Sequence, residues 1–244
     1  MRLLLLSNST NPGEAYLAWP KAEIKAFLGN RPLRAAFIPY AAVVFSYDEY
    51  EEKVAQVFSE FHCEIKSVHR AWNPVTTLEE SDVIIIGGGN TWRLVQQMRE
   101  HHLFEVVKRK VEAGTPYIGW SAGSNVACPT MKTTNDMPIV DPRGMETLGL
   151  VPFQINPHYL DAHPQGHGGE TREDRIHEFI ALNPDVFVIG LRESCLLRRE
   201  KNELKLIGSK SARLFHKDWI TKELTRKDDL SFLLESTIPT VPFY

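Results

Sequence analysis

Four consecutive β-branched residues, Val83–Ile86, constrain the fold of this chain more than any other feature. A strand that is apolar on both sides is buried on both faces, which is typical of a parallel sheet covered by helices on each side. Three glycines, Gly87–Gly89, follow at once, so the strand ends in a tight turn.

Shorter apolar runs alternate with longer segments of helical spacing through the first half of the chain. The other predicted strands cover residues 3–6, 35–38, 65–68 and 117–119. Apolar side chains recur at helical spacing in the segments between them, and the predicted helices cover residues 14–28, 47–61, 92–99 and 104–113. This repeat predicts an α/β fold, with a parallel or mostly parallel sheet flanked by helices on both faces. In such sheets, ligands bind at the carboxyl ends of the strands.

The second half of the chain is less regular. Residues 129–169 are rich in Pro, Gly, Asn, Asp and His, and a long irregular stretch in a compact domain is usually functional or mobile. No internal repeat or linker divides the sequence. One domain over residues 1–244 is therefore expected.

Regular elements are predicted again after the irregular stretch. Thr171 has the character of an N-cap, and the helix that follows is expected to end near Leu182. Residues 186–191 are predicted to form a strand. Residues 196–207 are predicted to form a hairpin that turns at Lys201-Asn202.

Composition excludes several classes of function. The chain of 244 residues has 28 basic and 31 acidic side chains, a balance that favours neither nucleic acid nor an anionic membrane as a partner. No stretch approaches the ~18 apolar residues of a transmembrane helix. The apolar run at residues 3–6 is too short for a signal peptide, and polar residues follow it directly.

Cysteine and histidine patterns give no sign of a disulfide framework or a metal site. The three cysteines, Cys63, Cys128 and Cys195, are scattered, which fits a reducing cytoplasm. The nine histidines contain no H-E-x-x-H pattern. We therefore expect a cytoplasmic protein with neither metal nor cofactor.

The clearest chemical motif is G-x-S-x-G at Gly119–Gly123, between a predicted strand and a predicted helix at residues 125–128. This context is typical of a nucleophile elbow, in which a sharp turn exposes the serine hydroxyl. Ser121 is therefore the candidate nucleophile. The helix start offers free N–H groups to a developing oxyanion, and the N–H of Ala122 is the first candidate donor.

The glycine-rich turn at residues 87–91 ends the strongest strand and has two candidate roles. Gly88 and Gly89 could supply a second oxyanion donor from the backbone, as in esterases. The turn could instead bind phosphate at the start of the next helix, but no lysine follows as in a P-loop. A tight turn with Asn90 or Thr91 as N-cap is compatible with the oxyanion role.

A serine nucleophile needs a base, usually a histidine oriented by a carboxylate. His158 follows a short apolar segment, and Asp136 lies between Ser121 and His158 in the sequence, in one of the known triad orders. The residues alone leave other histidines open as the base. These alternatives are His163, His167 and His216.

Six segments form a specific combination: Leu4–Thr10, Gly87–Thr91, Tyr117–Gly123, Thr133–Pro142, Gln154–His158 and Gly169–Glu173. Together they resemble the peptidase E family of α-aspartyl dipeptidases over most of the chain. The resemblance fades after Leu191, and the tail from Ser194 looks unlike the family.

The resemblance implies an α/β fold akin to class I glutamine amidotransferases and the hydrolysis of dipeptides with an N-terminal aspartate. Ser121 matches the family nucleophile and His158 its base. Asp136 matches the position commonly assigned as the orienting acid, and Glu193 lies where a glutamate has also been proposed. Both acids stay open at this point.

An aspartyl substrate needs a cationic partner, preferably a bidentate one. Arg172, at the start of a predicted helix, resembles the family's aspartate-recognising position, although a solvated arginine in a first helical turn is the alternative. Asn90 and Thr91 are further candidates for substrate contacts. The expected partners are small aspartyl dipeptides, with monomer and homodimer both open.

Two other functions fit the same motifs. One is a serine hydrolase with a different substrate, such as a cyanophycinase-like peptidase or an esterase. The other is a binding module without catalysis on the same kind of sheet.

Overall fold

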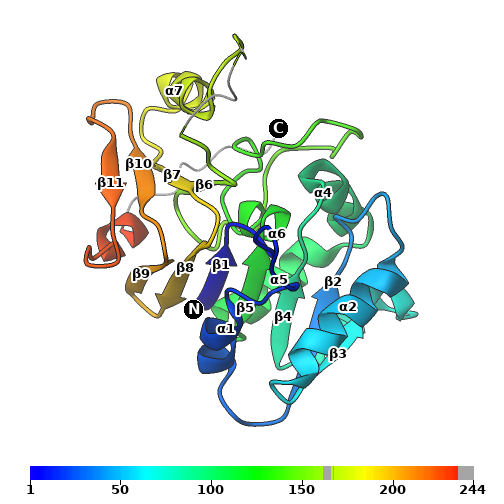
Figure 1. Cartoon of the computed structure of the whole chain (residues 1–244). Helices are drawn as coiled ribbons and strands as arrows, with labels where there is room; N and C mark the ends of the chain where they lie inside the picture. Colours follow the sequence, from blue (N-terminus) through cyan, green and yellow to red (C-terminus); the bar gives the residue numbers. More distant parts are fainter. Residues whose placement is uncertain (162–165, 167, 236–244) are drawn as a thin grey trace.

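The computed structural model describes residues 1–161, 166 and 168–235. Its larger sheet has seven strands in the order β3-β2-β4-β5-β1-β8-β9 (Figure 1). The first five of these are parallel: β3 (Cys63–Ser67), β2 (Leu33–Ile38), β4 (Val83–Ile86), β5 (Tyr117–Trp120) and β1 (Arg2–Leu6). The hairpin of β8 (Cys195–Glu200) and β9 (Glu203–Gly208) continues the sheet in antiparallel fashion beside β1. The predicted α/β fold with a mostly parallel sheet is confirmed.

Successive side chains point to opposite sides of a sheet, and in the inner parallel strands β1, β4 and β5 both sides are buried. On one face, Leu4 and Leu6 of β1 lie in a core with the apolar sides of α1 (Lys21–Leu28) and α2 (Tyr47–Ser59). Residues of three other helices pack on the opposite face of the sheet: α3 (Pro74–Glu79), α4 (Thr91–Glu100) and α5 (Leu103–Glu112). This double burial explains the continuous apolar runs in the sequence.

A second, four-stranded sheet has the order β11-β10-β7-β6. Its strands are β11 (Lys222–Leu224), β10 (Ala212–Phe215), β7 (Val188–Leu191) and β6 (Gln154–Pro157), of which β6 and β7 are parallel. Helix α7 (Arg172–Leu182) contributes Ile176 and Ile180 to a small core with residues of this sheet. Figure 1 shows α7 at the margin of the molecule, near β7 and β10.

Several predicted boundaries are confirmed. The strand at Val83–Ile86 has the expected limits. Thr171 caps α7, in a reciprocal capping box with Asp174. The hairpin β8-β9 turns at Lys201-Asn202.

Two predicted helices have the wrong limits. The helix expected over 14–28 begins only at Lys21. Pro20 precedes it, and a proline restricts the preceding residue to extended conformations, so a helix cannot run through this point. The helix expected over 125–128 is α6 (Ala122–Asn125), because the turn at Ser121 leads into it without an intervening loop.

Four short elements were not predicted: α3, β6, β10 and β11. Each has three to six residues, too few for a periodic pattern to stand out. Two one-turn 3₁₀ segments complete the described elements: η1 (Val68–Arg70) and η2 (Ser231–Leu234).

Among the described residues, no helix is both long and apolar enough to cross a membrane. All three cysteines are free and buried. Burial raises the pKa of Cys63 and of Cys128 to about 12, so these thiols stay protonated at neutral pH.

The close approach of α6 to β4 gives a first testable prediction. A Cβ atom at Gly123 would lie 2.2 Å from the carbonyl oxygen of Ile86, a backbone atom with no freedom to retreat. Gly123→Ala should therefore cost about 2 kcal/mol or more through overpacking. This loss should lower Tm by roughly 4–8 °C for a chain of this size.

Thermal unfolding followed by circular dichroism measures this effect. Gly168→Ala is the matched control, because a Cβ atom there meets nothing within 4 Å. An unchanged Tm in Gly123→Ala would contradict the close approach of the elbow to β4.

Candidate active site

Ser121 lies at the carboxyl end of β5 and is the N-cap of α6, with φ 52° and ψ −111°. A positive φ is strained for a residue with a side chain, and such strain is common at catalytic positions. The carbonyl oxygen of Leu6, at the end of β1, accepts hydrogen bonds from the Ser121 N–H at 3.0 Å and the Ser124 hydroxyl at 2.7 Å. The sharp turn that the motif predicted is therefore held against the neighbouring strand.

His158 comes to Ser121 from the other sheet. It follows β6, and β6 pairs with β7 so that Pro157 lies opposite Leu191. Because parallel strands end at the same edge, the residues after Pro157 and after Leu191 emerge side by side. This register brings Glu193 next to His158.

The contacts form a chain from the serine to the acid. The Nε2 atom of His158 lies 2.9 Å from Oγ of Ser121, and its Nδ1 atom lies 2.8 Å from Oε1 of Glu193. The side chains of His158 and Glu193 are 40% and 36% exposed, so solvent reaches both.

Asp136, the other candidate acid, has different partners. Its Oδ2 atom accepts hydrogen bonds from the N–H of Thr91 at 2.8 Å, the hydroxyl of Thr91 at 2.6 Å and the hydroxyl of Thr134 at 3.0 Å. In the part of the chain that the structure describes, no hydrogen bond joins Asp136 to His158. The geometry therefore does not support Asp136 as the orienting acid, because its loop is tied to the start of α4 instead.

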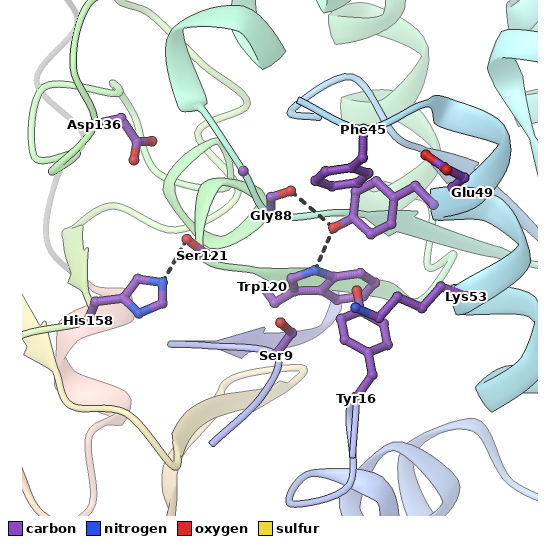
Figure 2. A pocket seen from close by; sticks show the side chains of 12 residues that line it. Ser9, Tyr16, Phe45, Glu49, Lys53, Gly88, Trp120, Ser121, Asp136 and His158 are labelled. Atoms are coloured by element: carbon purple, nitrogen blue, oxygen red, sulfur yellow. Dashed lines mark hydrogen bonds between the residues drawn. The ribbon is translucent and has the colours of Figure 1, made fainter. Parts of the chain in front are cut away.

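These residues border a cavity of about 710 Å³ (Figure 2). One part of its lining holds Ser121, His158 and Asp136, and another part is aromatic. The aromatic residues are Tyr16, Phe45, Tyr50 and Trp120. The remaining lining residues are Ser9, Glu49, Lys53, Gly88 and Gly89.

The glycine-rich turn approaches the serine closely. A Cβ atom on Gly88 would lie 3.1 Å from Cβ of Ser121, and one on Gly89 would lie 2.3 Å from the carbonyl oxygen of Ala41. The hydroxyl of Tyr50 donates to the carbonyl oxygen of Gly88 at 3.0 Å. That hydroxyl also accepts from Nε1 of Trp120 at 2.9 Å, so a buried chain of hydrogen bonds fixes the turn.

The other predicted site residues are near the cavity without lining it. Asn90 is the N-cap of α4, and its side chain accepts from the N–H of Arg93. Thr91 is fully buried, and its hydroxyl donates to Asp136. Ala122 is buried as the first residue of α6, so its N–H has no preceding helical turn to bond to.

Arg172 is the first residue of α7 and is partly buried. Burial and the neighbouring charge of Arg175 lower its pKa, whereas the charge of Asp136 acts in the opposite direction. Among the described residues, the guanidinium of Arg172 has neither an ion pair nor a hydrogen bond. Arg172 is therefore a partly buried cation for which the described part of the chain shows no partner.

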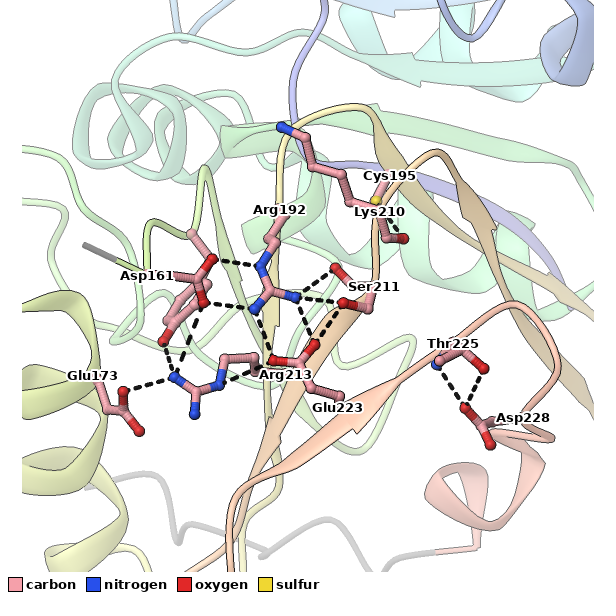
Figure 3. A network of polar contacts seen from close by, with 11 residues as sticks. Asp161, Glu173, Arg192, Cys195, Lys210, Ser211, Arg213, Glu223, Thr225 and Asp228 are labelled. Atoms are coloured by element: carbon pink, nitrogen blue, oxygen red, sulfur yellow. Dashed lines mark hydrogen bonds and ion pairs between the residues drawn. The ribbon is translucent and has the colours of Figure 1, made fainter.

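A network of charged side chains holds the segments that carry these residues (Figure 3). Arg192 precedes Glu193 and is only 12% exposed. Its guanidinium pairs with Asp161 at 2.5 Å and with Glu223 at 2.8 Å. Hydrogen bonds from Arg192 are the main reason that the pKa of Glu223 falls to about 2.

The second arginine of the network reaches two other segments. Arg213 of β10 donates to Glu173 at 2.7 Å and to the hydroxyl of Tyr159 at 3.2 Å. Glu173 follows Arg172, and Tyr159 follows His158. Each of the three site segments is thus anchored through a residue adjacent to the functional one. Sequence reasoning missed these arginines, because their partners are distant in the chain.

The alternative histidines are placed as follows. His216 packs between Phe187 and Trp219, with ring centroids at 4.4 Å and 5.6 Å, and does not line the cavity. His163 and His167 lie outside the described residues.

One group of three potential metal ligands occurs in the described part of the chain, at Asp48, Glu51 and His69. Arg70 forms ion pairs with both carboxylates of this group. The arginine already supplies the positive charge that a cation would bring, and none of the three residues lines the cavity.

Comparison with known proteins identifies the family. Residues 3–207 match the model of Peptidase family S51, and the chain belongs to this family. It is accordingly a peptidase, a hydrolase of peptide bonds. The match supports the coarser part of the predicted function, a serine dipeptidase.

The relatives are similar over nearly the whole chain. Peptidase E of Nostoc sp. (strain PCC 7120) is 49% identical over 234 residues, which cover 96% of this chain and 97% of the relative. Peptidase E of Salmonella arizonae is 46% identical over 215 residues, covering 88% and 93%. The expectation that the resemblance fades after Leu191 is wrong, because the family match continues to residue 207.

Solved structures support the fold. A peptidase from an acI-B1 Actinobacterium superposes with a TM-score of 0.70 at 17% identity, covering 95% of this chain and 96% of that one. A putative peptidase E protein from Listeria monocytogenes EGD-e gives a TM-score of 0.57 at 21% identity, covering 92% and 98%.

Proposed function

We propose that this peptidase hydrolyses dipeptides with an N-terminal aspartate, using Ser121 as nucleophile, His158 as base and Glu193 as orienting acid. The observation that carries the proposal is the chain of two hydrogen bonds from Ser121 through His158 to Glu193. With the Nδ1–H donated to Glu193, the Nε2 atom is the acceptor that faces the serine hydroxyl.

The reaction follows from this arrangement. Oγ of Ser121 attacks the peptide carbonyl carbon while His158 takes the hydroxyl proton. The resulting imidazolium is stabilised by Glu193 and donates a proton to the departing amine. His158 then activates a water molecule, which releases aspartate from the acyl-enzyme.

Backbone N–H groups on two sides of Ser121 are suited to stabilise the oxyanion. One is the N–H of Ala122, at the start of α6. The other belongs to the peptide between Gly88 and Gly89. In a trans peptide the C=O and the N–H point in opposite directions, and Tyr50 holds this C=O. The N–H of Gly89 is thus directed away from Tyr50, and Figure 2 shows Ser121 on the other side of Gly88.

Substrate selection is assigned to two parts of the site. The guanidinium of Arg172, for which the described residues offer no hydrogen bond or ion pair, suits the aspartyl carboxylate, since a carboxylate and an arginine form strong bidentate hydrogen bonds. The aromatic part of the cavity then accommodates the second residue of the dipeptide.

The orienting role of Glu193 is tested by Glu193→Gln. We expect kcat for Asp-Leu to fall by about 100-fold or more, since the amide cannot stabilise the imidazolium. Labelling by a fluorophosphonate should slow in parallel, and Ser121→Ala should not label at all. Unlabelled wild type would favour a binding module without catalysis.

The control for this substitution is Glu203→Gln, an exposed glutamate of β9 that pairs with Lys205. It should behave as wild type. Unchanged kcat in Glu193→Gln would remove Glu193 from the proposed triad.

The aspartate clamp is tested by Arg172→Ala, with Asp-Leu and Asn-Leu as substrates. Wild type should cleave Asp-Leu and leave Asn-Leu almost untouched. The variant should lose about 100-fold in kcat/KM for Asp-Leu, equivalent to roughly 3 kcal/mol for a charged hydrogen-bonded pair.

Arg175→Ala is the matched control, because Arg175 is exposed one turn along the same helix. Equal cleavage of Asp-Leu and Asn-Leu by wild type would keep the hydrolase and discard the clamp. Such a result would favour a hydrolase with a different substrate.

The oxyanion assignment is tested by Tyr50→Phe, which removes one hydroxyl and leaves the ring in place. Burial raises the pKa of Tyr50 to about 12, so the wild-type hydroxyl remains a donor at neutral pH. We expect kcat to fall by about tenfold with KM little changed. This is less than the roughly 100- to 1000-fold loss on removing a direct oxyanion donor, because Tyr50 acts through the turn.

Tyr40→Phe is the control, since Tyr40 is equally buried but lies in the other core. A change in KM alone in Tyr50→Phe would assign the hydroxyl to substrate binding and contradict the positioning role.

A further inference from the structure

Asp136 borders the cavity near Ser121 and is left without a role in the proposed chemistry. All three side-chain hydrogen bonds that it accepts go to Oδ2, from Thr91 and Thr134. Within the described residues, its Oδ1 atom has no hydrogen-bond donor. Figure 2 shows the carboxylate directed toward the part of the cavity that holds Ser121 and His158. One oxygen is therefore fixed to the protein, and the other is available to a ligand.

The surroundings of Asp136 indicate what kind of ligand this is. Three donors on one oxygen fix the orientation of the carboxylate before any substrate arrives. A free carboxylate oxygen accepts hydrogen bonds and attracts a cation, whereas it repels the carboxylate of an aspartyl side chain. The group that binds to it should therefore be positively charged.

We propose that Asp136 binds the α-ammonium group of the substrate's N-terminal residue. This inference rests on the proposed function and extends it to the free amino end of the dipeptide. An N-terminal aspartate carries an ammonium and a carboxylate on neighbouring carbon atoms. The site presents the complementary pair, a carboxylate at Asp136 and a guanidinium at Arg172.

The charges of Asp136 and Arg172 are not neutralised by pairing with each other. The negative charge of Asp136 raises the pKa of Arg172, against the larger lowering effects of burial and of Arg175. No ion pair within 4 Å joins the two side chains in the described part of the structure. Arg175 is the other cation that acts on Arg172, and it pairs with Glu170 at 3.5 Å on the exposed side of the helix. In the proposed binding mode, the ammonium of an N-terminal aspartate pairs with Asp136 and its side-chain carboxylate with Arg172.

This role makes a free amino terminus a condition for cleavage. An aspartyl residue inside a longer peptide has an amide in place of the ammonium, so Asp136 would gain no counter-ion on binding it. A charge that the substrate shields from water without supplying a counter-ion weakens binding. Selection for N-terminal aspartate would thus come from two charged contacts of opposite sign.

The test compares Asp-Leu with succinyl-leucine, which differs from it only by lacking the α-amino group. For wild type we expect kcat/KM to be about 100-fold higher for Asp-Leu. In Asp136→Asn this ratio should fall below about 5, because the amide has no charge to attract the ammonium. Asp141→Asn is the control, an aspartate of the same segment that caps the N–H of Arg143.

A second measurement needs no variant. The pKa of an α-amino group is about 7.7–8.0. KM of wild type for Asp-Leu should therefore rise as the pH passes this value, and KM for succinyl-leucine should not. Parallel pH profiles for the two substrates would overturn the inference.

The outcomes separate the inference from the function on which it rests. Equal losses for both substrates in Asp136→Asn, with the ratio unchanged, would assign Asp136 to catalysis and overturn the inference. A wild-type ratio near 1 would also overturn it, while leaving an Asp-Leu hydrolase intact. In this experiment, the outcome that would contradict the proposed function itself is a failure of wild type to cleave Asp-Leu at all.

Discussion

The hydroxyl of Ser7 joins the two sheets at the point where the serine and the histidine meet. Its Oγ atom accepts the N–H of His158 at 2.8 Å and donates to the carbonyl oxygen of Leu191 at 2.8 Å. Ser7 follows β1, whose last residue, Leu6, holds the elbow of Ser121. One buried hydroxyl thus links the end of the larger sheet to the ends of β6 and β7. The relative position of Ser121 and His158 depends on this junction.

Charge is distributed unevenly around the junction. Arg192 and Arg213 are surrounded by carboxylates and anchor the segments of the site, so their charges are neutralised within the protein. Arg172 and the outward oxygen of Asp136 are left without such partners among the described residues. The paired arginines stabilise the fold, whereas the unpaired groups are suited to a ligand. Such a difference is expected where surrounding residues hold the binding groups in place before the ligand arrives.

The aromatic part of the cavity and the turn at Gly88 are also physically coupled. Trp120 precedes Ser121, the proposed nucleophile, and donates to Tyr50, which in turn holds the peptide at Gly88. The same two rings line the cavity that we assign to the second residue of the dipeptide. The proposed substrate wall and the proposed oxyanion donors therefore share one set of buried hydrogen bonds.

The sequence alone determined the features that depend on neighbouring residues. Continuous apolar runs identified strands buried on both faces, and the spacing of glycines around Ser121 identified the elbow, because both patterns are local. Which of the two candidate acids lies beside His158 is not a local property. It depends on the pairing of β6 with β7, which places Pro157 opposite Leu191 and so brings Glu193 to His158. Asp136 is nearer to His158 in sequence, yet the tertiary structure ties it to Thr91, because hydrogen bonds between distant segments leave no periodic trace in the chain.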